Sequence, residues 1–191
     1  MPAAQPCDIL IDTKPLFGHC GLVVGNFNNK GQTNIMPRGQ EVVHATNAGI
    51  VWGLWGNGRA LCFRHPALTR VEAAAIQNVA VEIRDAASYG AARAIFKSWS
   101  GTSGFGSGAF ERLNKYRTRM QNHQGVLKNV YCSELVVVAY QLGLGIDRNH
   151  AAWIELDGKH TLPRTLRWRR RRFSSRVLVR IRALAISVLP V

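Results

Sequence analysis

Three residues of this sequence, one cysteine and two histidines, are of the types that carry out nucleophilic catalysis. Cys132 lies directly before an apolar stretch that is expected to be helical. A helix N-terminus has unpaired backbone N–H groups and a partial positive charge, and both lower the pKa of a thiol. The same N–H groups can stabilise the oxyanion that forms when a thiolate attacks a carbonyl carbon. Cys132 is therefore the candidate nucleophile.

Two histidines lie where they could assist such a thiolate. His19 begins a predicted strand over residues 19–25, and His44 lies in the next predicted strand, residues 41–46. Histidine is the usual general base because its unperturbed pKa lies near neutral pH. If the two strands form a hairpin, one face can carry both imidazoles, and His44 would orient His19 and set its tautomer. Glu41 lies three positions before His44 and so on the opposite face, which argues against it in this role.

The elements that must position these residues begin with strands. Period-two alternation and β-branched residues predict strands at residues 8–12, 19–25, 41–46, 49–55 and 59–64. Residues 26–40 are rich in Asn, Gly and Gln and are expected to form a loop. The predicted strands form an antiparallel meander over the first third of the chain.

Helices are expected to follow. The stretch from Thr69 to Glu72 is a capping box, which marks a helix N-terminus. Further helices are predicted at residues 88–99, 109–122 and 133–142, with Gly143 as the C-cap of the last and a mobile glycine-rich loop at residues 100–108. This order predicts an α+β fold in which an antiparallel sheet packs against helices.

The order of these segments resembles the circularly permuted branch of the NlpC family of papain-like hydrolases, to which the lecithin:retinol acyltransferase-like proteins belong. The matching segments are Asp-Ile-Leu-Ile at 8–11, Phe-Gly-His-Cys-Gly-Leu-Val-Val at 17–24, Val-Val-His-Ala at 42–45, Tyr-Cys-Ser-Glu-Leu-Val at 131–136, and a closing Leu-Pro-Arg-Thr-Leu around Pro163. In the usual papain order the cysteine comes first, whereas here the histidine precedes it. The resemblance covers roughly residues 8–166. It implies a permuted papain-like (NlpC-like) fold and a Cys-His-His triad of Cys132, His19 and His44.

Charge divides the chain into two parts. Residues 1–157 hold 15 Lys and Arg against 11 Asp and Glu, a net of +4, whereas residues 158–191 hold 10 Lys and Arg and no acid. We predict a catalytic domain over residues 1–166 and a basic, Arg-rich C-terminal segment over residues 167–191. Residues 176–186 within this segment could form an edge strand or an amphipathic helix. The segment could contact an anionic membrane surface. Nucleic acid is not an expected partner, because the sequence contains no recognisable nucleic-acid-binding module.

The remaining cysteines favour no metal or cofactor. Cys62 and His65 have CxxH spacing, but a second ligand pair is missing and no CxxC pair exists. Cys20 alternates to the face opposite His19, so we expect it in the core, and we expect the thiols to be free. The sequence begins without signal-peptide features and has no apolar run long enough to span a membrane. We therefore expect synthesis in the cytoplasm and, for an extracellular target, export by a dedicated secretion system to a target periplasm.

Residues and resemblance together favour a cysteine hydrolase that works through an acyl-enzyme. The substrate expected first is an amide bond in bacterial peptidoglycan peptides, cleaved by a secreted antibacterial effector that has an immunity or delivery partner. The alternative is a lipid-acting thiol acyltransferase or phospholipase of the lecithin:retinol acyltransferase type, which His44 and the Arg-rich cluster Arg169–Arg172 favour. The second alternative is a non-catalytic binding module on the same fold.

Overall fold

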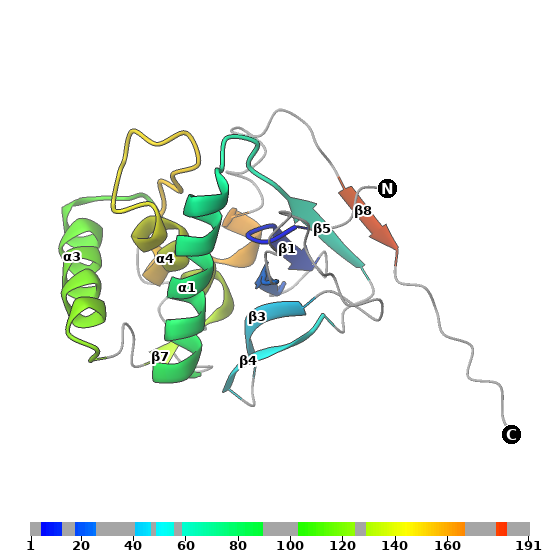
Figure 1. Cartoon of the computed structure of the whole chain (residues 1–191), viewed down its shortest axis with the longest axis horizontal. Coiled ribbons are helices and arrows are strands. Elements are labelled where there is room, and N and C mark those ends of the chain that lie inside the picture. Colours follow the sequence, from blue (N-terminus) through cyan, green and yellow to red (C-terminus); the bar gives the residue numbers. More distant parts are fainter. Residues whose placement is uncertain are drawn as a thin grey trace, which may run out of the picture.

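In the computed structural model the chain forms a six-stranded antiparallel sheet with helices packed against it (Figure 1), so the predicted α+β class is confirmed. The structure describes residues 5–12, 18–25, 41–46, 49–55, 59–89, 103–124, 129–166 and 179–182. The sheet contains β1 (Ile9–Asp12), β2 (Cys20–Val23), β3 (Glu41–Thr46), β4 (Gly49–Leu54), β5 (Arg59–Phe63) and β8 (Val179–Arg182). The helices are α1 (Arg70–Ala86), α3 (Ser107–Gln121) and α4 (Cys132–Gly143), with a 3-10 turn η1 (Gly158–His160).

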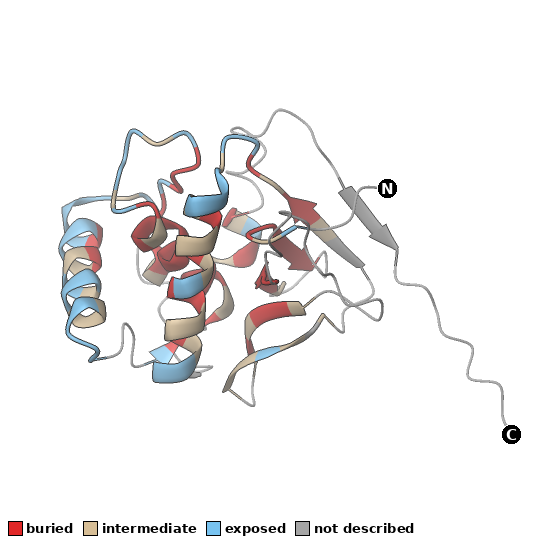
Figure 2. Ribbon diagram, viewed as in Figure 1, coloured by how far each residue is buried: buried red, intermediate tan, exposed pale blue. Residues whose placement is uncertain are grey.

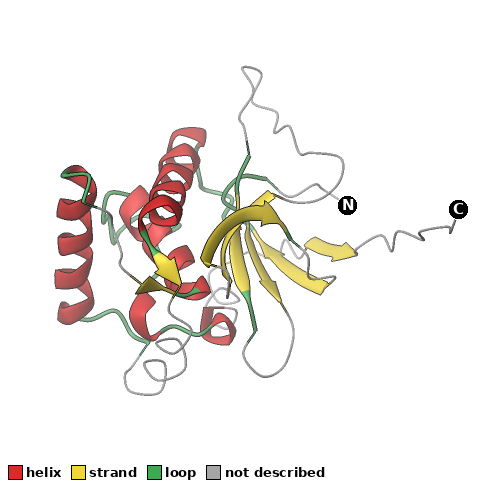
Figure 3. Cartoon of the chain, turned by 90° about the horizontal axis from the view of Figure 1, so that it is seen from below, coloured by secondary structure: helices red, strands yellow, loops and turns green. Residues whose placement is uncertain are grey.

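The strand order is β4-β3-β2-β1-β5-β8, so the predicted meander holds for β1 to β4 and is wrong for β5. β5 pairs with β1, with Leu10 opposite Cys62, and not with the strand that precedes it. In a flat sheet β4 and β5 would lie about 19 Å apart, at a spacing of about 4.8 Å per strand. The four residues between Leu54 and Arg59 span at most about 18 Å. The sheet therefore curls, and Figure 3 shows the strands bending around one another.

The two faces of this sheet bury different sets of side chains. On the helix-covered face, alternate strand residues pack with α1 and α4 into the main core; they include Ile9, Ile11, Cys20, Leu22 and Val43. On the second face, Leu10, Val23, Val42 and Cys62 form a smaller buried cluster against which Trp55 packs. All described members of this smaller cluster come from the sheet or from Trp55, directly after β4.

Helix α1 begins as the sequence predicts. The backbone N–H of Glu72 donates to Thr69 Oγ1 at 3.3 Å, and the backbone N–H of Thr69 donates to Glu72 Oε2 at 2.8 Å, which completes the capping box. The helix buries a stripe of small and aliphatic side chains: Ala73, Ile76, Val79, Ala80 and Ile83.

The helix predicted at residues 88–99 is wrong at its start. Ala87, which caps α1, is extended, and the chain continues as the short strand β6 (Ser88–Tyr89). β6 pairs in parallel with β7 (Asn129–Val130), just before α4. Backbone pairing with a distant segment overrides local helix preference here, and residues 90–99 lie outside the described part.

The next two helices lie close to their predicted positions. α3 starts at Ser107, two residues before the predicted start at 109, so the predicted glycine-rich loop ends at Gly106, and residues 100–102 of it lie outside the described part. α4 is buried over most of its length, whereas α3 has an exposed outer side (Figure 2).

The prediction that Gly143 is the C-cap of α4 is wrong. Gly143 is the last residue of the helix, and Leu144 is the C-cap. A Cβ at Gly143 would lie 2.5 Å from Ile76 Cα, so glycine is needed where α1 and α4 cross closely. Two left-handed residues follow the helix, Gly145 with φ +68° and Ile146 with φ +63°.

The Arg-rich C-terminal segment is described only in part. Residues 179–182 form β8, an edge strand paired antiparallel with β5, which selects the strand alternative for this stretch. The cluster Arg169–Arg172 and the loop predicted at 26–40 lie outside the described residues. Among the described helices, none combines the length and apolar character needed to cross a bilayer.

Candidate active site

The sheet brings the two predicted histidines together. β2 and β3 pair antiparallel, with Leu22 opposite Val43, so the predicted hairpin is confirmed. His19 Nε2 and His44 Nδ1 lie 2.7 Å apart, within hydrogen-bonding distance. Both histidines belong to the second face, because Leu22 and Val43 alternate onto the helix-covered face.

Two glycines make room for this pair. A Cβ on Gly21 would lie 2.4 Å from Val42 Cγ1 and 3.0 Å from His44 Cβ, so a side chain there would displace Val42 and crowd His44. Gly18 adopts φ +60°, a conformation that L side chains rarely adopt, and its Cβ position lies 3.3 Å from Pro163 Cβ. The segment around Pro163 therefore abuts the turn that delivers His19.

Cys132 is the first residue of α4, as predicted, and its helix start is anchored on both sides. The Tyr131 hydroxyl donates to the Gly158 carbonyl at 2.7 Å, and the Ser133 hydroxyl donates to the Thr161 carbonyl at 2.5 Å. Tyr131 and Ser133 are buried, whereas Cys132 between them is partly exposed. This anchoring fixes the direction of the Cys132 side chain at the helix N-terminus.

The surroundings of Cys132 favour its thiolate form. The pKa of the Cys132 thiol lies well below its usual range. Hydrogen bonding from Cys20 lowers it most, and a hydrogen bond with His19 and the charge of His19 lower it further, whereas burial raises it. The imidazole that the sequence assigned as the base is therefore among the groups that lower the pKa of Cys132. His19 links the other two predicted site residues, because it acts on Cys132 and its Nε2 lies 2.7 Å from His44 Nδ1.

The other three cysteines have the opposite tendency. Burial, followed by the charge of Asp8, raises the pKa of Cys7 to about 12, and the same two causes raise that of Cys62. Burial is also the main cause that raises the pKa of Cys20. All four cysteines are free, as predicted, and Cys132 alone among them has a lowered pKa.

His44 is held in its neutral form. Burial, followed by the positive charge of His19, lowers the pKa of His44 to about 4. At neutral pH His44 therefore offers His19 an uncharged hydrogen-bond partner.

Trp55 completes the site and was missed by the sequence reasoning, which placed it only within a strand. Its ring stacks on His19, with centroids 5.3 Å apart and an interplanar angle of 14°, and lies 5.8 Å from the ring of His44. Trp55 thus restricts the orientation of both imidazoles. No motif marked this residue; only its place at the end of the strand that pairs with β3 pointed toward His44.

Glu41 points away from the histidines, as predicted. Its Oε2 accepts a hydrogen bond from Trp52 Nε1 at 3.1 Å. The CxxH pair has other partners: Cys62 Sγ donates to Asp8 Oδ2 at 3.3 Å, and His65 Nδ1 accepts from the Ala67 N–H at 3.3 Å. Within the described residues no three His, Cys, Asp or Glu side chains are grouped to hold a metal ion.

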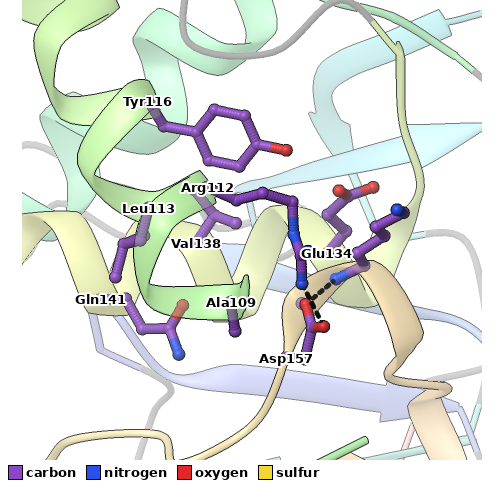
Figure 4. Close-up of a pocket in the computed structure, with 10 residues that line it drawn as sticks. Ala109, Arg112, Leu113, Tyr116, Glu134, Val138, Gln141 and Asp157 are labelled. Carbon is purple, nitrogen blue, oxygen red and sulfur yellow. Dashed lines mark hydrogen bonds and ion pairs between the residues drawn. The ribbon is translucent and has the colours of Figure 1, made fainter. Parts of the chain in front are cut away.

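A second polar cluster lies where α3, α4 and the segment at 157–159 meet (Figure 4). Arg112 of α3 forms an ion pair with Asp157, whose Oδ1 also accepts the Lys159 N–H at 3.1 Å. Glu134 of α4, fully buried, lines the same pocket. The pocket is lined by residues of α3, of α4 and of the segment at 157–159, and the Arg112–Asp157 ion pair joins α3 to that segment.

Comparison with protein-family models found no match, and neither did comparison with curated proteins or with solved structures.

Proposed function

We propose that this chain is a cysteine hydrolase of permuted papain-like fold, in which Cys132 is the nucleophile, His19 its base and His44 the residue that orients His19. The observation that carries the proposal is the 2.7 Å contact between His19 Nε2 and His44 Nδ1 beside a thiol whose pKa is lowered. A thiolate beside an oriented imidazole is the arrangement that covalent acyl transfer requires.

The low pKa of His44 indicates which nitrogen of His19 receives the proton of Cys132. Because His44 is neutral at pH 7, its Nδ1 can accept a hydrogen bond from the Nε2–H of His19. The nitrogen of His19 that remains for Cys132 is then Nδ1. Cys132 Sγ gives its proton to this nitrogen, and the resulting imidazolium keeps its hydrogen bond to His44.

The acyl transfer follows from this charge-separated pair. The thiolate of Cys132 attacks a carbonyl carbon, and the carbonyl oxygen becomes an oxyanion near the N–H groups of the first turn of α4. The imidazolium of His19 returns its proton to the leaving amine or alcohol as the bond to the carbonyl carbon breaks. Water, activated by the same imidazole, then attacks the thioester and releases the acid.

For the substrate we propose an amide bond of bacterial peptidoglycan peptides, with the chain acting as a secreted antibacterial effector. The segment resemblance and the formal net charge of +14 support this, because the bacterial wall is anionic. An effector of this kind would require a delivery route and an immunity partner in the producing cell. If cells that receive the protein in their periplasm without such a partner grow normally, the effector part of the proposal fails.

The direct test incubates purified wild type, Cys132→Ala and Cys62→Ala with peptidoglycan sacculi and, separately, with mixed phospholipid vesicles. Cys62 is the control because it is also a free cysteine and its thiol has other partners than the candidate site residues. Mass spectrometry should detect released wall peptides with wild type and Cys62→Ala and none with Cys132→Ala. Fatty acid or lysolipid release would instead assign the enzyme to the lipid-acting class. Release that persists in Cys132→Ala would contradict the assigned nucleophile, and absence of any product with wild type would favour the binding module.

A further inference from the structure

The backbone pairing between β2 and β3 ends before it reaches Cys20, and the ladder is open there. β2 pairs with β1 as far as Cys20, which lies opposite Ile11, whereas its pairs with β3 are Leu22 with Val43 and Val23 with Val42. Within the described strands, Cys20 thus has a partner on the β1 side and none on the β3 side.

The direction of the Cys20 backbone follows from the alternation of hydrogen bonds along an antiparallel strand. The His19 carbonyl accepts from the Asp12 N–H at 2.7 Å, so the peptide groups of His19 point toward β1. Successive residues point their N–H groups to opposite sides of a strand. The N–H of Cys20 therefore points toward β3, where the ladder is open, and α4, which begins at Cys132, packs against β2. A backbone hydrogen bond from Cys20 is also among the causes that lower the pKa of Cys132.

The side chain of Cys20 reaches the same sulfur from the core. Cys20 has 0% of its surface exposed and belongs to the main core cluster, against which Cys132 packs. The titratable groups that act on Cys132 are Cys20, through its thiol, and His19, through its imidazole. Alternation along β2 places Cys20 and His19 on opposite faces, so Cys132 at the rim of the sheet touches one group from each face.

Of the two thiols, Cys132 is the one whose surroundings favour ionisation. Cys132 begins a helix and contacts an imidazole, and both favour a thiolate. Cys20 is enclosed by aliphatic side chains such as Leu22 and Val43, where an anion would be strongly disfavoured. Cys20 thus remains a neutral S–H, able to donate.

We propose that Cys20 is a positioning residue for the nucleophile, with its S–H and its backbone N–H both donating to Cys132 Sγ and holding the sulfur beside His19. The inference rests on the proposed role of Cys132 and adds a fourth residue to its chemistry. The core position expected for Cys20 is confirmed by its burial, yet its thiol also serves the site.

The test is the rate of Cys132 alkylation by iodoacetamide as a function of pH, with the labelled residue identified by mass spectrometry. Cys20→Ala and Cys20→Val remove the side-chain donor, and Cys20→Ser retains one. The matched control is Cys7→Ala, which removes another buried thiol of the same core cluster, one that donates to the Ala73 carbonyl. This readout needs no substrate, and thermal unfolding of each variant shows whether it folds.

With the donor removed, we expect Cys132 to be alkylated about three- to tenfold more slowly at mildly acidic pH, and the midpoint of its pH profile to lie higher. The rate falls because a hydrogen bond to a charged group is lost, and the effect is limited because a thiol is a weak donor. Cys20→Ser should restore most of the rate, and Cys7→Ala should match wild type. A wild-type profile in folded Cys20→Ala or Cys20→Val would overturn the inference and leave the proposed function intact. If Cys132 in wild type itself titrates like an ordinary thiol, the proposed function fails and the inference with it. Should Cys20→Ala fail to fold, the pair Cys20→Val and Cys20→Ser decides the question.

Discussion

Cys132 and Cys62 are both free cysteines in contact with a titratable side chain, but the two contacts have opposite electrostatic character. Cys62 donates to the Asp8 carboxylate, and burial together with that negative charge raises its pKa. Cys132 lies at a helix start beside Cys20 and His19, and these neighbours lower its pKa. For Cys62 the neighbouring carboxylate adds to the effect of burial, whereas for Cys132 the neighbouring groups outweigh burial, so the two thiols differ in the sign of their pKa shift.

The two environments lie toward opposite ends of β1. Asp8 precedes the first residue of β1, and Arg64 binds it through two hydrogen bonds of 2.9 and 2.7 Å. His19 lies at the other end, where the last residue of β1, Asp12, donates its N–H to the His19 carbonyl. The sheet therefore carries a carboxylate–guanidinium pair near one end of β1 and an imidazole pair near the other.

The largest effect is expected from removing the imidazole beside Cys132. His19→Ala should reduce kcat/KM by about 10²- to 10⁴-fold, the usual contribution of a general base. It should also raise the pKa of Cys132, because hydrogen bonding and charge from His19 both lower it. Hydrolysis of whichever substrate wild type cleaves, together with the alkylation profile, measures both effects.

The control for this variant is His150→Ala. His150 Nε2 contacts Glu72 Oε1 at 3.0 Å at the start of α1, and His150 Nδ1 accepts from the Ala152 N–H at 3.1 Å. Activity of His150→Ala should stay near wild type. Retention of wild-type activity by His19→Ala would show that His19 is not the base.

Asp8→Asn tests the other thiol. The buried Asp8 side chain has 1% of its surface exposed and pairs with Arg64, and removing one partner of a buried pair costs about 3 kcal/mol of unfolding free energy. The pKa of Cys62 should fall only in part, because burial is the larger cause of its elevation. Urea unfolding and alkylation of Cys62 at alkaline pH check the two expectations.

Glu155→Gln is the matched control, since it removes an exposed ion pair with Arg148 and should change stability by less than about 1 kcal/mol. An Asp8→Asn variant as stable as Glu155→Gln would show that the pair with Arg64 does not stabilise this end of the sheet.

His44→Gln tests the contribution of the second imidazole, which contacts His19. Glutamine can still accept from His19, so we expect a loss of activity of about tenfold, smaller than for His19→Ala. The pH dependence of stability should also change. The pKa of His44 is about 4 in the folded chain against 6.5 ordinarily, so the unfolded chain binds more protons between these values. This contribution to wild-type stability is therefore lost as the pH falls from about 6.5 to about 4.

Urea midpoints measured across this pH window should decline less steeply for His44→Gln than for wild type. Equal slopes for the two proteins would mean that His44 is not held neutral by its surroundings.

The smallest expected effect lies away from both thiols. Thr69→Ala removes the side-chain cap of α1 and should lower the unfolding free energy by about 1 kcal/mol. Neither the alkylation profile of Cys132 nor that of Cys62 should move. A shift at either thiol would show that the two environments depend on helix stability more than on their local neighbours.

Local signals in the sequence predicted much of this arrangement. The capping box at Thr69, the apolar run after Cys132 and the alternation along residues 19–25 depend on neighbours in sequence, and the structure bears out each of them. The approach of His19 and His44 followed from one further assumption, that consecutive strands pair, and the register of β2 and β3 satisfies it.

The remaining features depend on contacts between distant segments. The pairing of β5 with β1 comes from the curl of the sheet, and β6 forms because Ser88 and Tyr89 find a partner strand just before α4. Trp55 reaches the imidazoles for the same reason, since its position is set by where β4 ends on the curled sheet. The interaction of Cys20 with Cys132 arises where α4 meets an open ladder, which no periodicity records.

The most direct test of the central claim is the pH profile of iodoacetamide alkylation for all four cysteines of the native protein, resolved by mass spectrometry. Exposure alone would make the partly exposed Cys132 react faster than its buried counterparts at every pH, so the midpoint of each profile is the decisive quantity. We predict that Cys132 reaches its full rate well below the pKa of about 8.5 for a free thiol, while Cys7, Cys20 and Cys62 stay unlabelled there. A Cys132 profile that rises only near that ordinary pKa would contradict the assignment of Cys132 as an activated nucleophile.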